Sequence, residues 1–272
     1  MAKGIAYTKH LDLTQTKGVY EQPVENWNFL YETSTTKNPQ YDVGDRVVLP
    51  DGRVFRYGKS YSSLASGQVM GPGYGACFYG QAGSRSGLVA ATQALGDKSL
   101  TIASQTLTLD ELRGGYLYLW ETGDSYVQQR GIIGNTEVSN ATVTIYLDAP
   151  LERAITTSCG VEFLPNPYLS LAGYYGNESN YASVAGVPTV RVATASAYFW
   201  IQTWGPCYVG CAEAGVGQVL GERQLVFNQA GTVRPHNSTY ATTAQYQHAG
   251  FIIDRCASGV DSPPFIMLQI SP

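Results

Sequence analysis

Apolar and polar residues alternate in short runs along most of the chain after residue 40, which is the spacing of β-strands. The alternation is most regular over residues 41–59, where it stops at Pro50-Asp51-Gly52 and resumes at Val54. Proline fixes φ, and Asp-Gly favours a tight reversal between two strands. This segment therefore predicts a β-hairpin.

Similar turn-bounded runs recur over residues 98–165 and 166–272, without strong helical periodicity. In the phrase GYLYLWE, Leu117 and Leu119 share one face of the expected strand. The opposite face carries three aromatic residues, Tyr116, Tyr118 and Trp120. Large side chains on both faces predict a strand that is covered on both sides. We expect an all-β fold of two small β-barrel or sandwich-like units with long Gly/Tyr-rich loops.

The expected organisation has three parts. Residues 1–40 form an extended, irregular N-terminal arm. Residues 41–165 form a β domain with an inserted Gly/Ser-rich loop at 60–95, and residues 166–272 form a second β domain. The arm is polar, rich in threonine and without clear periodicity. It lies on a neighbouring surface or wraps around its own domain, and the sequence leaves both arrangements open.

Tyrosine and glycine take the place of charged residues in the composition. Charged residues make up 14% of the 272-residue chain, below the roughly 25% of typical soluble domains, and there are 20 Tyr and 30 Gly. The net charge is −4 and Lys/Arg clusters are absent, which argues against a nucleic-acid groove that works by phosphate neutralisation. A tyrosine-rich β surface favours contacts with other proteins.

No residue pattern predicts a cofactor, a metal site or a membrane segment. The five cysteines are scattered, and Cys207 and Cys211 lack C-x-x-C spacing, so we expect reduced, mostly buried thiols. No apolar run reaches the roughly 20 residues of a membrane span, and the first residues lack the apolar core of a signal peptide. We expect a soluble protein that is synthesised in a cytoplasm.

The histidines and carboxylates form no recognisable catalytic group, and we expect that the protein is not an enzyme. His10, His236 and His248 lie in no catalytic motif, and the sequence lacks G-x-S-x-G. The two carboxylates of a glycosidase can lie far apart in a chain, so a pair of that kind stays open.

Sugar binding is a more serious alternative, because exposed aromatic rings on a β surface can stack on glycans. The aromatic candidates are Trp27, Trp120, Trp200, Trp204 and Tyr174-Tyr175. Trp120 and Trp200 lie in apolar strands, which predicts core positions. Trp204 precedes Gly205-Pro206 at an expected strand end, where it is exposed or fills a subunit contact.

Several phrases of the sequence, taken in order, resemble the head proteins of tailed bacteriophages. The phrases are YDVGDRVVLPDGRVFRYGK, LRGGYLYLWETGDSYVQQRGIIGNTE, TVTIYLDAPLERAIT, LPNPY, GVPTVRV and YFWIQTWGPC. They are similar in particular to capsid decoration (cement) proteins, which are encoded beside the major capsid protein. The resemblance covers residues 41–272.

The resemblance implies a virion structural protein that has no cofactor and performs no reaction. Such proteins bind the outer shell of an expanded capsid, usually as trimers, and brace it against the pressure of the packaged DNA. The implied partners are the major capsid protein and further copies in a homotrimer, with neither nucleic acid nor membrane. The alternative function is a phage tail or head-surface adhesion protein that binds host glycans.

We expect the arm and the glycine-rich loop to provide contacts with the capsid or with neighbouring copies. The candidate contact residues are Tyr7, Leu11, Leu13, Tyr20, Trp27, Phe29, Tyr31, Tyr74 and Trp204. Deletion of residues 1–30 is expected to leave a folded protein that no longer binds capsids.

Overall fold

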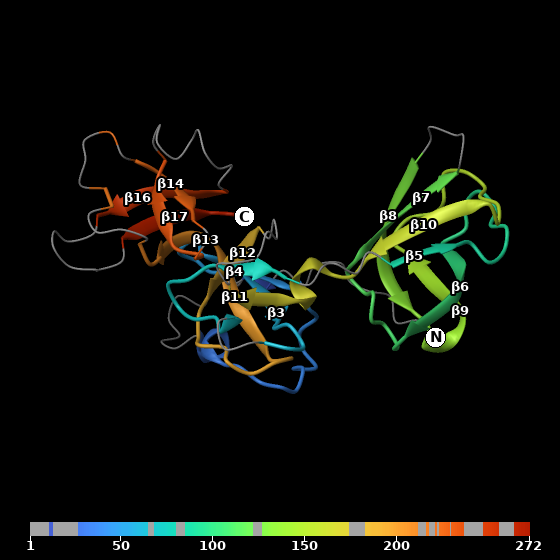
Figure 1. The fold of residues 1–272 in the computed structure, drawn as a ribbon, viewed down its shortest axis with the longest axis horizontal. Coiled ribbons are helices and arrows are strands. Elements are labelled where there is room, and N and C mark those ends of the chain that lie inside the picture. The colour runs from blue at the N-terminus through green and yellow to red at the C-terminus, as the bar shows by residue number, and fades with distance from the viewer. Residues whose placement is uncertain are drawn as a thin grey trace. The chain divides into compact units, whose positions relative to one another are not determined.

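β-strands provide most of the regular structure of this chain (Figure 1). The computed structural model describes residues 11–12, 27–64, 68–79, 85–121, 127–173, 183–211, 216–217, 221, 223–228, 230–236, 247–255 and 264–272. Short 3-10 turns with described bounds are η2 (Trp27–Tyr31) and η4 (Pro167–Leu169). The predicted all-β fold with two β units is confirmed.

The chain forms two compact units, and one is inserted into the other. Unit 1 consists of the described residues between 81 and 167, and unit 2 of those in 6–80 and 168–272. This differs from the expected domains at 41–165 and 166–272. Strand pairing explains the difference, because β3 (Val54–Lys59) pairs with β13 (Tyr198–Tyr208) and so places the hairpin in unit 2.

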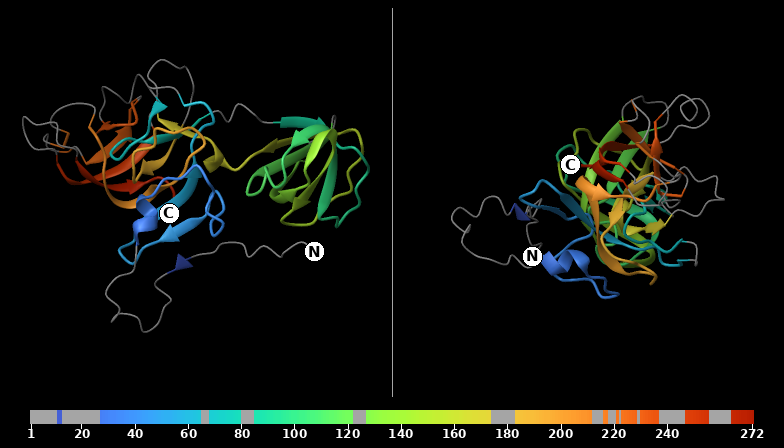
Figure 2. Two further views of the ribbon diagram at one scale, coloured as in Figure 1. Left: turned by 90° about the horizontal axis from the view of Figure 1, so that it is seen from below. Right: turned by 90° about the vertical axis from the view of Figure 1, so that its left-hand side faces the viewer.

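Unit 1 is a six-stranded sheet that curls around one core. Its strands are β5 (Arg85–Leu88), β6 (Ser99–Leu107), β7 (Tyr116–Glu121), β8 (Val127–Asn135), β9 (Val138–Leu147) and β10 (Cys159–Leu164). Their order in the sheet is β5-β10-β7-β8-β9-β6. Figure 2 shows these green and yellow strands wrapping around a common interior.

The two ends of the unit 1 sheet nearly meet, which makes it a nearly closed barrel. Val89, directly after β5, bridges to Ile102 in β6, and Ala90 N donates to Thr101 O at 2.8 Å. Both Val89 and Ile102 are buried in a single core cluster with Leu117. This arrangement leaves few unpaired strand edges.

Unit 2 contains an eleven-stranded sheet. The strands not yet given are β1 (Leu11–Asp12), β2 (Arg46–Val48), β4 (Ala76–Phe78), β11 (Leu171–Gly173), β12 (Val184–Pro188), β14 (Gln224–Phe227), β15 (Val233–Pro235), β16 (His248–Asp254) and β17 (Phe265–Gln269). The main order is β1-β2-β3-β13-β17-β16-β14-β15, and β4, β11 and β12 pair beside this path.

The predicted hairpin is present as β2 and β3. Val48 pairs with Val54, and Gly52 N donates to Leu49 O at 2.9 Å across the turn. Gly52 has φ of 85°, a conformation that glycine adopts without a steric cost. Asp51 fixes the turn further, because its carboxylate accepts a hydrogen bond from the Arg53 backbone at 3.0 Å.

The described end of the N-terminal segment, residues 27–40, belongs to unit 2 and is not an extended arm. Leu30 of η2 is fully buried, in a core cluster with Tyr57 and Trp200. The Thr189 hydroxyl also donates a hydrogen bond to Leu30 O. The segment wraps around its own domain because its aromatic side chains fill this cluster. Deletion of residues 1–30 would therefore remove part of the core.

Unit 1 is attached to unit 2 at two neighbouring strands. The chain leaves unit 2 after β4 and returns before β11, and these strands are antiparallel partners in which Leu171 pairs with Phe78. Tyr79 N donates to Ser170 O at 2.9 Å just beyond this pair. Within unit 1, β5 and β10 are antiparallel partners as well. Both ends of the insertion are thus held together by strand pairing.

Candidate binding faces

The outer side of β5, β10, β7 and β8 in unit 1 carries a group of aromatic and aliphatic side chains, which we call the aromatic face. Leu117 and Leu119 point into the core, so the alternate residues of β7 point outward. The strand register places these side chains in three rows, Leu88–Gly160–Trp120–Val127, Ser86–Glu162–Tyr118–Gln129 and Leu164–Tyr116–Gly131. The sequence correctly grouped the three aromatic residues.

This face is open to solvent, contrary to the expectation that β7 is covered on both sides. Leu88 is 60% exposed, Val127 54% and Tyr116 48%. Trp120 is half-buried and lies on the outer side, whereas the sequence placed it in the core. Trp200 does lie in the core as predicted, at 2% exposure.

Glycine at position 160 makes room for the Trp120 ring. A Cβ built on Gly160 would lie 2.6 Å from Trp120 Cε2 and 2.7 Å from Cζ2, too close for any side chain. Gly160 is directly opposite Trp120 in the β7–β10 ladder and is itself buried. The indole therefore lies across the backbone of the neighbouring strand, and it is 5.5 Å from the Tyr118 ring between centroids.

The middle row of the aromatic face is polar. The Tyr118 hydroxyl donates a hydrogen bond to the Glu162 carboxylate on the neighbouring strand β10. This bond is the main reason that the pKa of Tyr118 is raised. Exposed Gln129 and Ser86 flank the pair on β8 and β5. Hydrogen-bonding groups thus lie between two rows of apolar side chains. The sequence gave no local signal for Glu162 or Gln129, because their position depends on strand register.

Unit 2 presents an outward surface of a different kind on β13, β17 and β16, which Figure 1 shows side by side. The strand register aligns Tyr208 with Phe265, Pro206 with Met267, and Phe251 with Met267. Tyr208 is 61% exposed and Phe251 43%, and the Tyr208 and Phe265 rings are 4.5 Å apart. We call these five residues the apolar face. The sequence analysis did not identify it.

Two residues expected to make contacts lie at the margin of the apolar face. Trp204 is half-buried in the middle of β13, opposite Gln269, and not at a strand end, because the strand continues through Gly205 to residue 208. Gly205 allows this with φ of 95°. Tyr74 is 55% exposed, and its ring lies beside Gly210, just beyond the end of β13.

The other expected contact residues with described side chains, Trp27, Phe29 and Tyr31, are not among the residues of either face. Tyr7, Leu13 and Tyr20 lie outside the described residues, and Leu11 lies in β1, which pairs in parallel with β2. Trp27 and Phe29 pack within unit 2, where the Phe29 ring is 5.7 Å from Trp200. Tyr31 is 52% exposed.

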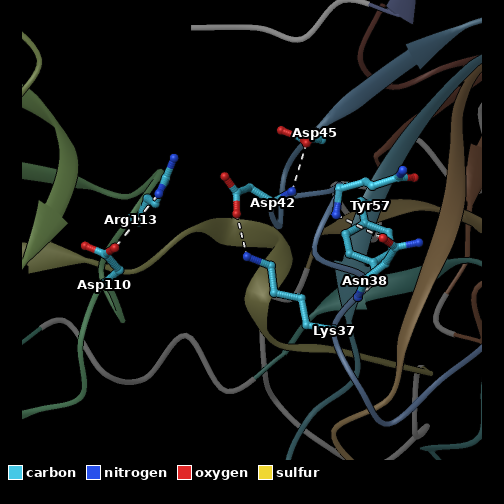
Figure 3. A network of polar contacts seen from close by, with 8 residues as sticks. Lys37, Asn38, Asp42, Asp45, Tyr57, Asp110 and Arg113 are labelled. Atoms are coloured by element: carbon cyan, nitrogen blue, oxygen red, sulfur yellow. Dashed lines mark hydrogen bonds and ion pairs between the residues drawn. The ribbon is translucent and has the colours of Figure 1, made fainter. Parts of the chain in front are cut away.

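A polar loop contacts Tyr57, which belongs to the same core cluster as Trp200, and Figure 3 shows the polar contacts of this loop. Lys37 Nζ lies 2.5 Å from Asp42 Oδ1, and Asp42 N donates to Asp45 Oδ2 at 2.8 Å. Asn38 N donates to the Tyr57 hydroxyl at 3.3 Å. Burial is the main cause that raises the pKa of Tyr57. These contacts fix the loop to its own domain and give it a structural role.

The titratable groups of the described residues form no evident reaction centre. Cys77, Cys159 and Cys207 are buried free thiols and Cys211 is a half-buried one, in agreement with the sequence analysis. Burial raises the pKa of Cys77 and of Cys207 to about 12, which leaves little reactive thiolate. Among the described residues, no group of three or more His, Cys, Asp and Glu side chains could hold a metal ion.

A small hollow in unit 1 lies at the end of the aromatic face. It is lined by Leu119, Trp120, Glu121, Gln128, Arg153, Ala154, Ile155 and Cys159 and encloses about 10 Å³. This volume has room for about one water molecule, so the hollow does not enclose a substrate. Both faces are open surfaces.

Comparison of the chain with protein-family models, with curated proteins and with solved structures gave no match. In the described part of the chain, no helix has the length and apolar character needed to span a membrane.

Proposed function

We propose that this protein is a structural component of a tailed-phage virion, a decoration protein that binds the outer surface of the capsid and stabilises it. The apolar face of unit 2 carries the proposal. Its residues, Tyr208, Phe265, Met267, Phe251 and Pro206, include the aromatic residues and methionine that are enriched in protein interfaces. The phrases that resemble head proteins favour the major capsid protein as the partner.

The backbone of the apolar face favours docking to a protein. Its side chains project from three hydrogen-bonded strands, so little backbone entropy is lost when a partner binds. Inward residues of the same strands, such as Ile266 and Leu268, are fully buried and hold the face in place. A rigid apolar surface matches a large, flat protein lattice.

Capsid stabilisation then follows from mass action. A protein that binds the assembled lattice but not its dissociated subunits shifts the equilibrium toward the lattice. The effect grows with the number of copies, even when each contact is modest. We propose that copies bind as homotrimers on the capsid exterior, with neither a cofactor nor a chemical step.

Co-sedimentation with expanded capsids that lack this protein tests the proposal. The full-length chain is expected to pellet with the capsids and to give regular density on the outer shell in cryo-electron microscopy. Tyr208→Ser and Phe251→Ser are expected to weaken binding at least tenfold. The matched control Leu95→Ser changes a side chain of unit 1 that is 67% exposed and should bind normally. Absence of capsid binding by the unmodified protein overturns the proposal.

A further inference from the structure

We infer that the aromatic face of unit 1 is a saccharide-binding site. Tyr116, Tyr118 and Trp120 project from alternate positions of one strand, and the ring centroids of Tyr118 and Trp120 are 5.5 Å apart. This spacing is on the order of one sugar ring per aromatic side chain. The residue opposite Trp120 is Gly160, which lets the indole lie across the neighbouring strand.

The apolar rows match the apolar faces of sugar rings. Trp120 lies between Gly160 and Val127 in one row, and Tyr116 lies beside Leu164 in another. Tyr116 and Leu164 are 48% and 37% exposed, so their apolar surface is available to a ligand. The C–H groups of a sugar ring carry a partial positive charge. They are attracted to the face of an aromatic ring, which carries a partial negative charge, and the two rings therefore stack.

The polar row matches the hydroxyl groups of the same ligand. The Glu162 carboxylate is an acceptor that is fixed in place by Tyr118, and Gln129 and Ser86 supply further donors and acceptors on each side. Sugar hydroxyls can donate to the carboxylate and accept from the amide. Charge-assisted hydrogen bonds of this kind are about twice as strong as neutral ones.

The same polar row argues against a protein as the occupant. A dry protein contact would bury the Glu162 carboxylate, which is costly without a charged partner. A saccharide solvates that carboxylate with its own hydroxyls. The saccharide site lies on unit 1 and the apolar face on unit 2, so the saccharide site does not depend on the proposed capsid binding.

A glycan array tests this inference with the full-length protein. The array would carry bacterial O-antigen and capsular polysaccharides together with maltohexaose, cellohexaose and chitohexaose, and titration calorimetry would measure the affinity of each ligand found. At least one saccharide is expected to bind. Trp120→Ala and Tyr116→Ala are expected to weaken binding at least tenfold, and Glu162→Gln to weaken it less because the amide keeps an acceptor.

Two controls separate loss of the site from loss of the fold. Leu109→Ala removes a side chain of unit 1 that is 66% exposed and lies outside the rows, so it should bind like the unmodified chain. Tyr116→Ala changes an exposed side chain, so it should keep the unfolding temperature even if Trp120→Ala does not. The inference is overturned if the protein binds none of the saccharides, or if binding persists in both aromatic variants. It is also overturned if a protein is found to occupy the face instead.

Discussion

Trp120 and Gly160 are directly opposite each other on β7 and β10, and the indole occupies the space that a side chain at position 160 would need. A Cβ atom at position 160 would lie 2.6 Å from Trp120 Cε2. The absence of a side chain on one strand thus sets the orientation of the aromatic ring on the next. This relationship holds the Trp120 ring against β10 within the aromatic face.

Gly160→Ala is expected to displace the Trp120 ring and to destabilise unit 1. Forcing a methyl group into a filled space costs about 1–3 kcal/mol in well-packed sites. Differential scanning calorimetry of the full chain would measure the loss. Gly71→Ala is the matched control, since a Cβ there has no atom within 4 Å. Equal unfolding temperatures for the two variants would contradict the packing described for Trp120.

Removal of the inserted unit is expected to leave unit 2 folded. Joining Tyr79 to Tyr168 through a short glycine linker keeps the Tyr79 N to Ser170 O bond and the β4–β11 pair intact. A shorter connection also lowers the entropy cost of closing the loop. Circular dichroism and thermal unfolding of the shortened chain would test this. A shortened chain without a cooperative unfolding transition would contradict the assignment of two units.

Leu30→Ala is expected to destabilise unit 2 by about 2–5 kcal/mol, the usual range for truncating a fully buried leucine. The neighbouring Tyr31 is 52% exposed, so Tyr31→Ala should change the free energy of unfolding by less than about 0.5 kcal/mol. Urea denaturation would measure both. Similar values for the two variants would show that residues 27–31 are not packed into the core.

Unit 2 is expected to lose stability above about pH 10. Burial raises the pKa of Tyr57 and of Tyr41 above the usual value of about 10, so the folded state holds these protons more tightly than the unfolded chain does. The resulting stability is complete below pH 10 and falls as pH rises through the raised values. Urea denaturation from pH 8 to 12 measures it, and Tyr57→Phe should reduce the decline. An unchanged decline in that variant would contradict the assignment to Tyr57.

The sequence alone predicted those features that depend on residues close together in the chain. The β2–β3 hairpin was predicted because Pro50-Asp51-Gly52 specifies the reversal locally. The grouping of Tyr116, Tyr118 and Trp120 followed from strand alternation. Buried free thiols followed from the scattered cysteines.

Features that depend on distant pairing were not accessible from the sequence. The insertion rests on the pairing of β3 with β13, and no local pattern records a partner so far along the chain. Alternation also could not show that the outer side of β7 is open, since this depends on Gly160 and the other strands beside it. The apolar face was missed for the same reason, because Tyr208, Phe265 and Phe251 come from separate segments.

The paired attachment of unit 1 has a consequence for the order of folding. The strands of unit 1 come from one continuous stretch, so it can fold during synthesis before β13 has left the ribosome. Its β5–β10 pair then brings the two flanking segments of the chain together. The loop that must close before β3 and β13 can pair is then effectively shorter, because the residues of unit 1 no longer contribute to its length. We therefore expect the inserted unit to speed the folding of the domain that contains it.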